Sequence, residues 1–361
     1  MSISAPLPTA PPSRRGGLRH ETVSPFAEGH LAEDCGLMRG SPFGLSRNNF
    51  LILLSMVLWG CGEGMWFYIQ PLYIKSLGAN SLQIGLVLSL APVVMVFGFI
   101  PVSILADRYG RKKTLVGGSV AGTLAVLLLA AAGDWRQSIL GFLLYYGSGC
   151  CLPAIHAYVA HGSGGKDLNR VFTMLYSAFT LGLIVFPTIG GWLAERAGFG
   201  AVLIVAGFFY ALSTLVATQV TEQPVDPSPV GFGFREVLSN RRLLLVSSLA
   251  VVIFFALYLG QPFAPNYLEE VVGVELAWIG FLGSVHALGA TVLSLWLGRL
   301  TEGVGGFIVG QGLVLVSLLV FLRSRALPLL TVSFFLRGAF NACRSLALAL
   351  TGRVVSTTSV G

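Results

Sequence analysis

Ten apolar stretches, each close to twenty residues long, constrain this chain more than any other feature of its sequence. A helix rises about 1.5 Å per residue and therefore needs about 20 residues to cross the roughly 30 Å hydrocarbon core of a bilayer. Within lipid, every backbone N–H and C=O must be paired inside the protein, so such stretches fold as helices. We therefore predict an all-α polytopic membrane protein. The predicted spans are 49–74, 81–104, 114–132, 137–160, 171–195, 199–220, 243–264, 275–298, 305–322 and 326–349.

The composition excludes a soluble protein. Of the 361 residues 54% are hydrophobic and 11% are charged, whereas soluble domains carry about 25% charged residues. A net charge of +7 at first favours nucleic acid as a partner, but the cations lie in short turns between apolar stretches and form no continuous basic face. We expect the lipid bilayer, and no nucleic acid, to be the partner of these cations.

The distribution of the cations predicts how the chain crosses the membrane. If the N-terminus is cytoplasmic, sixteen Lys and Arg residues outside the spans lie on the cytoplasmic side and five lie on the other side. Cytoplasmic loops of membrane proteins carry this excess of positive charge. We therefore predict a multi-pass protein with a cytoplasmic N-terminus, most simply of a prokaryotic plasma membrane.

Polar segments divide the chain into predicted domains. Residues 1–47 are rich in Pro, Ser, Gly and Arg and are expected to be a disordered cytoplasmic tail, with Met38 as an alternative start. Residues 221–242 contain three prolines and form the longest polar interruption between spans. The prediction is a six-helix bundle over 48–220, a cytoplasmic linker over 221–242, and a bundle of four helices over 243–361.

An internal repeat supports this division. A shift of 195 positions places Ile84-Gly85 on Ile279-Gly280 and Ser89 on Ser284. Pro71-x-Tyr73 also matches Pro265-x-Tyr267 after insertion of one residue. Six spans separate each pair, and an even number of crossings returns the chain to the same side. The two halves are therefore predicted to be parallel repeats about an axis along the membrane normal.

A short charged loop, Ser103–Lys113, lies between the second and third spans and reads Ser-Ile-Leu-Ala-Asp-Arg-Tyr-Gly-Arg-Lys-Lys. It resembles the Gly-x-Leu-Ala-Asp-Arg-x-Gly-Arg-Lys loop of the major facilitator superfamily, with Ser103 in place of glycine. The repeat supplies a second, weaker copy at 298–305. The residues of interest in the two copies are Asp107, Arg108, Gly110, Arg111, Gly298, Glu302 and Gly305.

The resemblance implies a secondary active transporter whose two bundles rock about a central site, with the loops as a gate on the cytoplasmic side. A carboxylate such as Asp107 suits the positive N-terminal end of a helix in the opposite half, and Arg108 and Arg111 suit nearby acids or carbonyls. The alternative is that the cations only anchor the topology. Members of this superfamily typically have twelve spans, so the ten predicted here are interpreted as a chain that lacks the last two.

Polar residues inside apolar spans are candidates for the transport path, since an ionisable group in a membrane is costly. Glu63 lies in the first span and is expected to carry a proton that a substrate or a cation such as Arg337 displaces. The alternative for Glu63 is a packing or ion-pair role. Most of the candidates fall in spans one, four, seven and ten, which line the cavity in the resembled superfamily. They are Glu63, His156, Tyr258, Gln261, Arg337, Asn341 and Arg344; His286 in the eighth span does not fit, and for it, as for His156, helix packing is the favoured interpretation.

The fifth span carries a possible kink motif. Gly182, Pro187, Gly190 and Gly191 match the antiporter signature of drug-exporting members, while two other expected glycines are replaced. A Pro-x-x-Gly-Gly segment is equally consistent with close helix packing. The motif favours export only slightly.

Other classes of function are less consistent with the sequence. It contains neither Gly-x-Ser-x-Gly nor His-Glu-x-x-His, and its five cysteines have neither disulfide nor zinc-ligand spacing. We therefore expect no enzyme, no cofactor and no metal site, but a monomeric, proton-coupled carrier of a small-molecule substrate with efflux slightly favoured. The alternatives are an inactive or regulatory fragment, or an uptake symporter or uniporter for a sugar or an organic anion.

Overall fold

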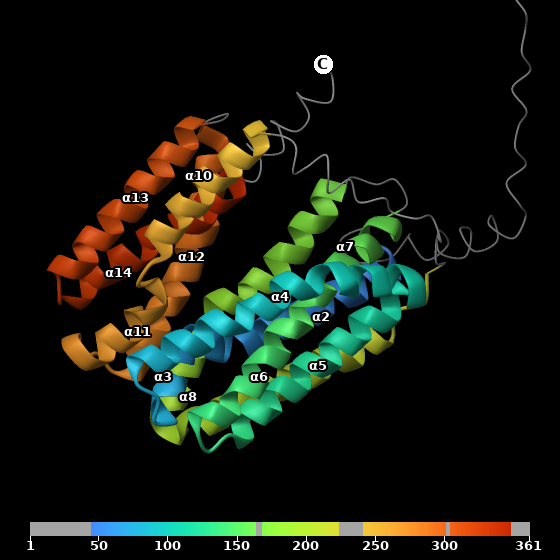
Figure 1. Ribbon diagram of the computed structural model, residues 1–361, viewed down its shortest axis with the longest axis horizontal. Coiled ribbons are helices and arrows are strands. Elements are labelled where there is room, and N and C mark those ends of the chain that lie inside the picture. The colour runs from blue at the N-terminus through green and yellow to red at the C-terminus, as the bar shows by residue number, and fades with distance from the viewer. Residues whose placement is uncertain (1–44, 164–167, 224–240, 301–303, 348–361) are drawn as a thin grey trace, which may run out of the picture. The chain divides into compact units, whose positions relative to one another are not determined.

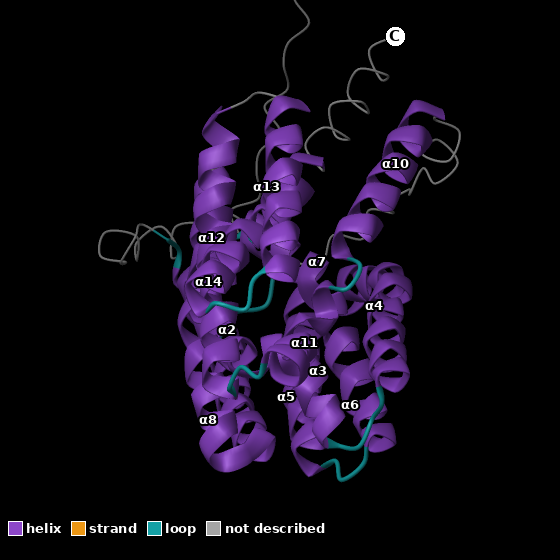
Figure 2. Ribbon diagram, turned by 90° about the vertical axis from the view of Figure 1, so that its left-hand side faces the viewer, coloured by secondary structure: helices purple, strands orange, loops and turns teal. Residues whose placement is uncertain are grey.

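The computed structural model describes residues 45–163, 168–223, 241–300 and 304–347. Its contacts separate residues 1–47 from residues 48–361, and the helices belong to the second unit, except that the first of them begins at Arg47. Residues 1–44 of the predicted tail and residues 224–240 of the predicted linker lie outside the described residues. Every regular element in the described ranges is helical, as Figure 2 shows.

The helices follow the predicted spans closely (Figure 1). Those of the first half are α2 (Arg47–Trp66), α3 (Gln70–Ser76), α4 (Ser81–Tyr109), α5 (Arg111–Ala131), α6 (Trp135–Ser148), α7 (Leu152–His161) and α8 (Leu168–Thr218). Those of the second half are α10 (Arg241–Tyr258), α11 (Ala264–Tyr267), α12 (Leu276–Leu300), α13 (Val304–Arg323) and α14 (Leu327–Arg337), and residues 339–347 are also helical.

Eight segments of the described chain are long and apolar enough to cross a membrane. One of them, Arg170–Thr218, contains both the fifth and the sixth predicted spans, which separate at Gly198. This residue has φ 80°, a conformation that favours glycine, so the chain turns there without a longer loop. The tenth predicted span consists of α14 and helix 339–347, separated by a turn at Gly338.

Local sequence explains where several helices begin. The Asn80 side chain accepts a hydrogen bond from the Gln83 N–H, and the Gln83 side chain accepts one from the Asn80 N–H, which forms a capping box at the start of α4. Asp134 caps α6 by accepting from the Arg136 N–H. Gly110, with φ 106°, makes the turn between α4 and α5.

The internal repeat has a structural counterpart. Helix α12 begins at Leu276, which lies 195 positions after Ser81 at the start of α4. The first and seventh spans both change to a 3-10 helix part-way, at Phe67–Ile69 and Gln261–Phe263. The fourth changes at Gly149–Cys151, and the tenth is interrupted at Gly338. The four spans that the resemblance assigns to the cavity are therefore the ones that are broken.

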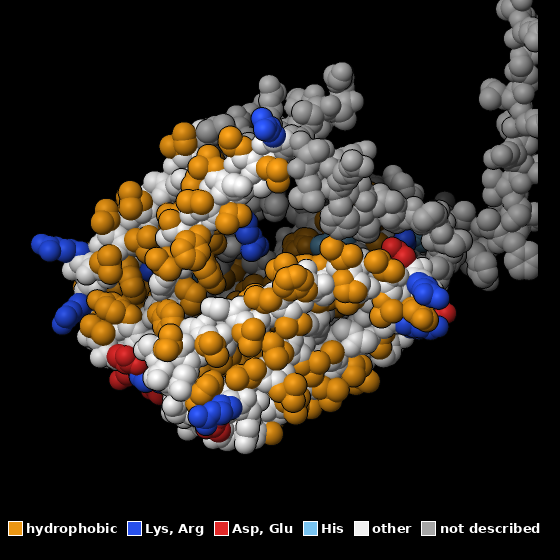
Figure 3. All heavy atoms as spheres, viewed as in Figure 1, with side chains coloured by type: hydrophobic (Ala, Val, Ile, Leu, Met, Phe, Trp, Pro, Cys, Tyr) orange, Lys and Arg blue, Asp and Glu red, His pale blue; other side chains and the backbone are white. Residues whose placement is uncertain are grey.

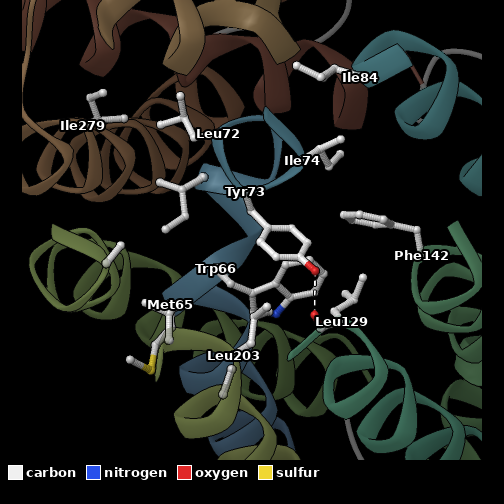
Figure 4. Packing of buried hydrophobic residues seen from close by; sticks show 14 of the residues in the cluster. Met65, Trp66, Leu72, Tyr73, Ile74, Ile84, Leu129, Phe142, Leu203 and Ile279 are labelled. Atoms are coloured by element: carbon white, nitrogen blue, oxygen red, sulfur yellow. Dashed lines mark hydrogen bonds between the residues drawn. The ribbon is translucent and has the colours of Figure 1, made fainter. Parts of the chain in front are cut away.

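A buried cluster near the junction of α2 and α3 packs residues of the first half together and includes residues of the second half such as Ile279 (Figure 4). Trp66 and Phe142 are buried there with ring centroids 6.0 Å apart, and the Tyr73 hydroxyl donates to the Leu129 carbonyl at 2.6 Å. Many large hydrophobic side chains remain exposed on the outer faces of the helices, and Figure 3 shows them spread over the face it presents. Such a surface requires lipid around it.

Candidate substrate cavity and the contacts between the halves

A cavity of about 570 Å³ lies between the two halves, and Figure 3 shows a hollow between α4 and the helices of the second half. Its walls come from the broken first, fourth, seventh and tenth spans and from α4, α8 and α12. The lining includes aromatic side chains, among them Phe67, Tyr146, Phe255, Tyr258 and Phe263. The volume is within the range of sites for small organic molecules.

Three of the predicted path residues line this cavity. Tyr258 ends α10, Gln261 begins the following 3-10 turn, and Asn341 lies just beyond Gly338 in the tenth span. Gln261 donates from its side chain to the Leu257 carbonyl at 2.7 Å, which fixes its orientation. These residues reach the cavity because the helices that carry them are interrupted beside it.

Glu63 lies in an aromatic cluster of the first half. Its carboxylate accepts hydrogen bonds from Trp59 Nε1 at 3.0 Å and from Tyr145. Trp59 stacks on Tyr210 with ring centroids 4.1 Å apart, and the Tyr210 hydroxyl accepts from Trp66 Nε1 at 3.2 Å. Two donors stabilise the charged carboxylate, whereas the apolar surroundings favour the neutral acid.

Arg337 does not pair with Glu63 in this structure. The ion pairs of the described chain join Lys75 to Glu269 and Glu270, and Arg136 to Asp134. Arg337 is only 3% exposed, and its guanidinium lies over the rings of Phe321 and Phe334, 4.6 and 4.4 Å from their centroids. The sequence suggested that Glu63 and Arg337 lie at a similar depth in the membrane, but equal depth does not bring two helices into contact.

Two residues that the sequence did not select accompany Arg337. Tyr68 and His286 both line the cavity, and both interact electrostatically with the Arg337 guanidinium. The Tyr68 hydroxyl, His286 Nδ1 and Arg337 Nε are buried without a hydrogen-bond partner. His286, in the eighth span, was expected to be a packing histidine, and Tyr68 lies in the 3-10 segment of the first span.

The other candidates of the fourth and tenth spans lie apart from Arg337. Arg344 is exposed and interacts electrostatically with Tyr176 and Tyr258. The ring of His156 is 2.6 Å from the Tyr176 hydroxyl in a hydrogen bond. The predicted shared face of Arg337, Asn341 and Arg344 is therefore divided between a buried, a cavity-lining and an exposed position, because Gly338 interrupts the helix.

The charged loop forms few contacts in the described chain. Asp107 and Arg108 are exposed at the end of α4, and Arg111 donates to the Ala157 carbonyl of its own half at 3.4 Å. Gly298 is exposed near the end of α12 and Gly305 is exposed in α13, while Glu302 lies outside the described residues. The gate predicted for these loops is not formed by described residues here.

The opposite end of the bundle has contacts between the halves that the sequence did not predict. Lys75 Nζ lies 2.6 Å from Glu269 Oε2 and 2.8 Å from Glu270 Oε1. Glu195, near the end of the fifth span, accepts from the Ala277 N–H at 2.9 Å, in the first turn of α12. We name these four side chains, Lys75, Glu195, Glu269 and Glu270, the latch.

The internal repeat contains a signal that would have revealed the latch. When Pro71 is aligned with Pro265, Lys75 falls on Glu269. Two equivalent residues of parallel repeats can touch only close to the axis that relates the repeats. The ion pair therefore marks the position of that axis at this end of the bundle.

The Pro-x-x-Gly-Gly segment packs against two neighbours. A side chain at Gly190 would collide with the Met65 carbonyl of α2, and one at Gly191 with the Leu276 carbonyl and Gly280 of α12. One turn away, the Thr188 hydroxyl donates to Ser284 Oγ at 2.8 Å. The expected close approach of helices is present, and it joins the fifth span to both halves.

No group of three or more potential metal ligands occurs among the described residues. Cys61, Cys150, Cys151 and Cys343 are buried free thiols in helices, as expected of small packing residues.

Comparison with known proteins agrees with this geometry. The sequence profile of the Major Facilitator Superfamily matches residues 49–361. An MFS-type transporter of Methanocaldococcus jannaschii is 25% identical over 308 residues, which cover 80% of this chain and 77% of that protein. A multi-drug resistance efflux pump PmrA homolog of Lactococcus lactis is 28% identical over 72% of this chain and 67% of its own length, and the enterobactin exporter EntS of Shigella flexneri is 28% identical over 64% and 58%.

Solved structures show the same fold at low sequence identity. The nucleoside transporter NupG superposes with a TM-score of 0.70 at 16% identity, covering 84% of this chain and 82% of its own. A peptide transporter in complex with sulfate superposes with a TM-score of 0.67, also at 16% identity, over 88% and 83%. With the profile match over most of its length, a cavity between two helical halves and a lipid-type surface, this chain belongs to the Major Facilitator Superfamily of membrane transporters.

Proposed function

We propose that this protein moves a small solute across the membrane by alternating access, with the two halves rocking about the cavity. The observation that carries the proposal is that both halves line the cavity while salt bridges with partly exposed side chains join them at one end. Partly exposed pairs contribute about 0.2–1 kcal/mol each, so they can break during a transport cycle. In this proposal the structure is a state closed at the latch.

Proton coupling through Glu63 is the second part of the proposal. A carboxyl group held by Trp59 and Tyr145 can accept hydrogen bonds as a carboxylate and can donate one as a neutral acid. The two states differ in charge within the membrane, so they favour different arrangements of the halves. We propose that proton uptake by Glu63 biases this equilibrium.

Export is the favoured direction, because several of the similar proteins carry the names of efflux pumps or exporters. We further propose two bundles, over 48–220 and 243–361, joined by the cytoplasmic linker 221–242 and preceded by a cytoplasmic N-terminus. The excess of cations at the loop end supports this orientation. The protein is proposed to act as a monomer.

The test uses purified protein in liposomes that carry a pH-sensitive dye. The vesicles carry an imposed pH gradient, and either ethidium, a cationic probe, or mandelate, an anionic probe, is added. The pH gradient is expected to dissipate faster than in protein-free vesicles. Glu63→Gln is expected to abolish this faster dissipation, whereas Glu222→Gln, which alters an exposed acid beyond α8, is not. If the gradient dissipates at the wild-type rate with Glu63→Gln, Glu63 has no part in the mechanism.

A further inference from the structure

Arg337 presents an unusual electrostatic situation. Its guanidinium is buried and is not part of any ion pair, and none of the described residues hydrogen-bonds to it. The faces of Phe321 and Phe334 offer cation–π attraction, which is weaker than the cost of removing an unpaired cation from water. The guanidinium therefore lacks a negative partner in this state.

The groups around Arg337 are also incomplete. The Tyr68 hydroxyl is a buried donor without an acceptor, and it belongs to the cavity wall. His286 Nδ1 is buried without a hydrogen-bond partner, and with the ring proton on Nε2 this atom is an acceptor. Nδ1 is then free to accept a hydrogen bond. Tyr68 of the first half and His286 of the second half thus place a free donor and a free acceptor in the cavity wall, and both interact electrostatically with the buried Arg337.

We infer that Arg337, Tyr68 and His286 form a subsite for the carboxylate of a small aromatic acid that carries a hydroxyl group beside it. The carboxylate accepts hydrogen bonds from Arg337 and Tyr68, and the neighbouring hydroxyl donates to His286 Nδ1. The aromatic body of the ligand packs against Phe255 and Phe263 of the cavity wall.

This arrangement differs from a structural role for Arg337 in a measurable way. A structural arginine would be hydrogen-bonded in the empty protein, and its removal would destabilise the fold. An arginine that awaits an anion has no such bonds, so loss of its charge leaves the empty protein at least as stable and removes only the effect of the ligand. The inference rests on the proposed transport function for its biological meaning, but binding can be tested without transport.

The experiment compares three probes: mandelate, its neutral amide mandelamide, and phenylacetate, which lacks the hydroxyl. Thermal unfolding of the detergent-purified full chain is followed by tryptophan fluorescence at increasing probe concentration. Mandelate is expected to raise the midpoint, mandelamide to leave it unchanged, and phenylacetate to act roughly tenfold more weakly than mandelate. Equal effects of mandelate and mandelamide would overturn the inference, as would no effect of mandelate.

Two variants connect the effect to the subsite. Arg337→Gln is expected to abolish the mandelate shift, and Tyr68→Phe to weaken mandelate binding by roughly tenfold without lowering the midpoint of the empty protein. Tyr267→Phe is the matched control, since Tyr267 packs on the same Phe321 ring, 5.1 Å between centroids. An Arg337→Gln variant that does not fold would instead assign Arg337 a structural role, and unchanged mandelate binding in Tyr68→Phe would refute the subsite.

Failure of transport would give a different result. A protein that binds mandelate in detergent but moves neither mandelate nor ethidium in liposomes would contradict the proposed function and leave the subsite intact. A protein that exchanges ethidium for protons but is not stabilised by mandelate would contradict the subsite alone.

Discussion

The two ends of the helical bundle differ in how they join the halves. At the latch end, Lys75 pairs with two acids of the second half, and Glu195 accepts from the first turn of α12. At the loop end, Asp107 and Arg108 are exposed, and Arg111 contacts a carbonyl of its own half. The more recognisable motif therefore lies at the end where its described residues are exposed or contact their own half, and the salt bridges between the halves lie where the sequence has no known signature.

The latch end has the kind of contact that the sequence predicted for the loop end. Glu195 at the start of α12 places a carboxylate against the positive end of a helix in the other half, which is the role that the sequence assigned to Asp107. A carrier that alternates between two states needs breakable contacts at each end in turn. The expectation for Asp107 stays a prediction about a state in which the loop end is closed.

The largest expected effect comes from the packing of α8 against α12 beside the latch. Gly280→Leu would drive a side chain into the Pro187 carbonyl and Gly191, and overpacking costs about 1–3 kcal/mol or more. A large loss of folded protein is expected in detergent size-exclusion profiles and thermal midpoints. Gly298→Leu, near the loop end of the same helix, meets no atom within 4 Å and serves as the control. If both variants lose the same amount of folded protein, close packing of α12 is not confined to the latch end.

The second effect concerns the charges of the latch. Lys75→Glu replaces two attractions by repulsion from Glu269 and Glu270, with an expected loss of about 1–2 kcal/mol in the stability of the closed latch. A cysteine introduced beside the latch is then expected to react faster with a water-soluble maleimide. Combination with Glu269→Lys and Glu270→Lys is expected to restore slow labelling. If the triple variant labels as fast as the single variant, the ion pairs do not close this end.

A smaller effect is expected at the start of α12. Glu195→Gln keeps a hydrogen-bond acceptor for the Ala277 N–H but loses the negative charge at the helix N-terminus, which contributes about 0.3–1 kcal/mol. In the same cysteine-labelling assay, Glu195→Gln should react modestly faster than the wild type. Salt screens the charge and should reduce this difference. Glu222→Gln, a change at an exposed acid that is not at the start of α12, is the control. A loss as large as that of Lys75→Glu would assign Glu195 a greater role than the charge–dipole contact explains.

The smallest effect on this state is expected at the loop end. Asp107→Asn should change the free energy of unfolding by no more than about 0.5 kcal/mol, because the side chain is exposed. The thermal midpoint should therefore change little. Transport in liposomes should nevertheless decrease if the loop closes in the other state. A variant with normal transport as well as normal stability would leave Asp107 without a role in gating.

The helices could be predicted from the sequence because membrane spans depend on length and apolarity, which are local properties. The separation of the fifth and sixth spans at Gly198 and the 195-residue repeat could both be predicted from the sequence. The partners of buried polar groups were not, since they depend on which helices face each other. Glu63 therefore lies with Trp59 and Tyr145 and not with Arg337, and Tyr68 and His286 were missed although each is a polar residue in an apolar span.

Lys75 pairs with Glu269, the residue at the equivalent position of the second repeat. This pairing disfavours the association of two copies of the same half. If two copies of the first half met across the same axis, Lys75 would face another Lys75, and two copies of the second half would bring Glu269 and Glu270 against their duplicates. Like charges at such a contact oppose association, whereas the mixed pair attracts. Opposite charges at one pair of equivalent positions thus give each half a preference for the other half over a second copy of itself.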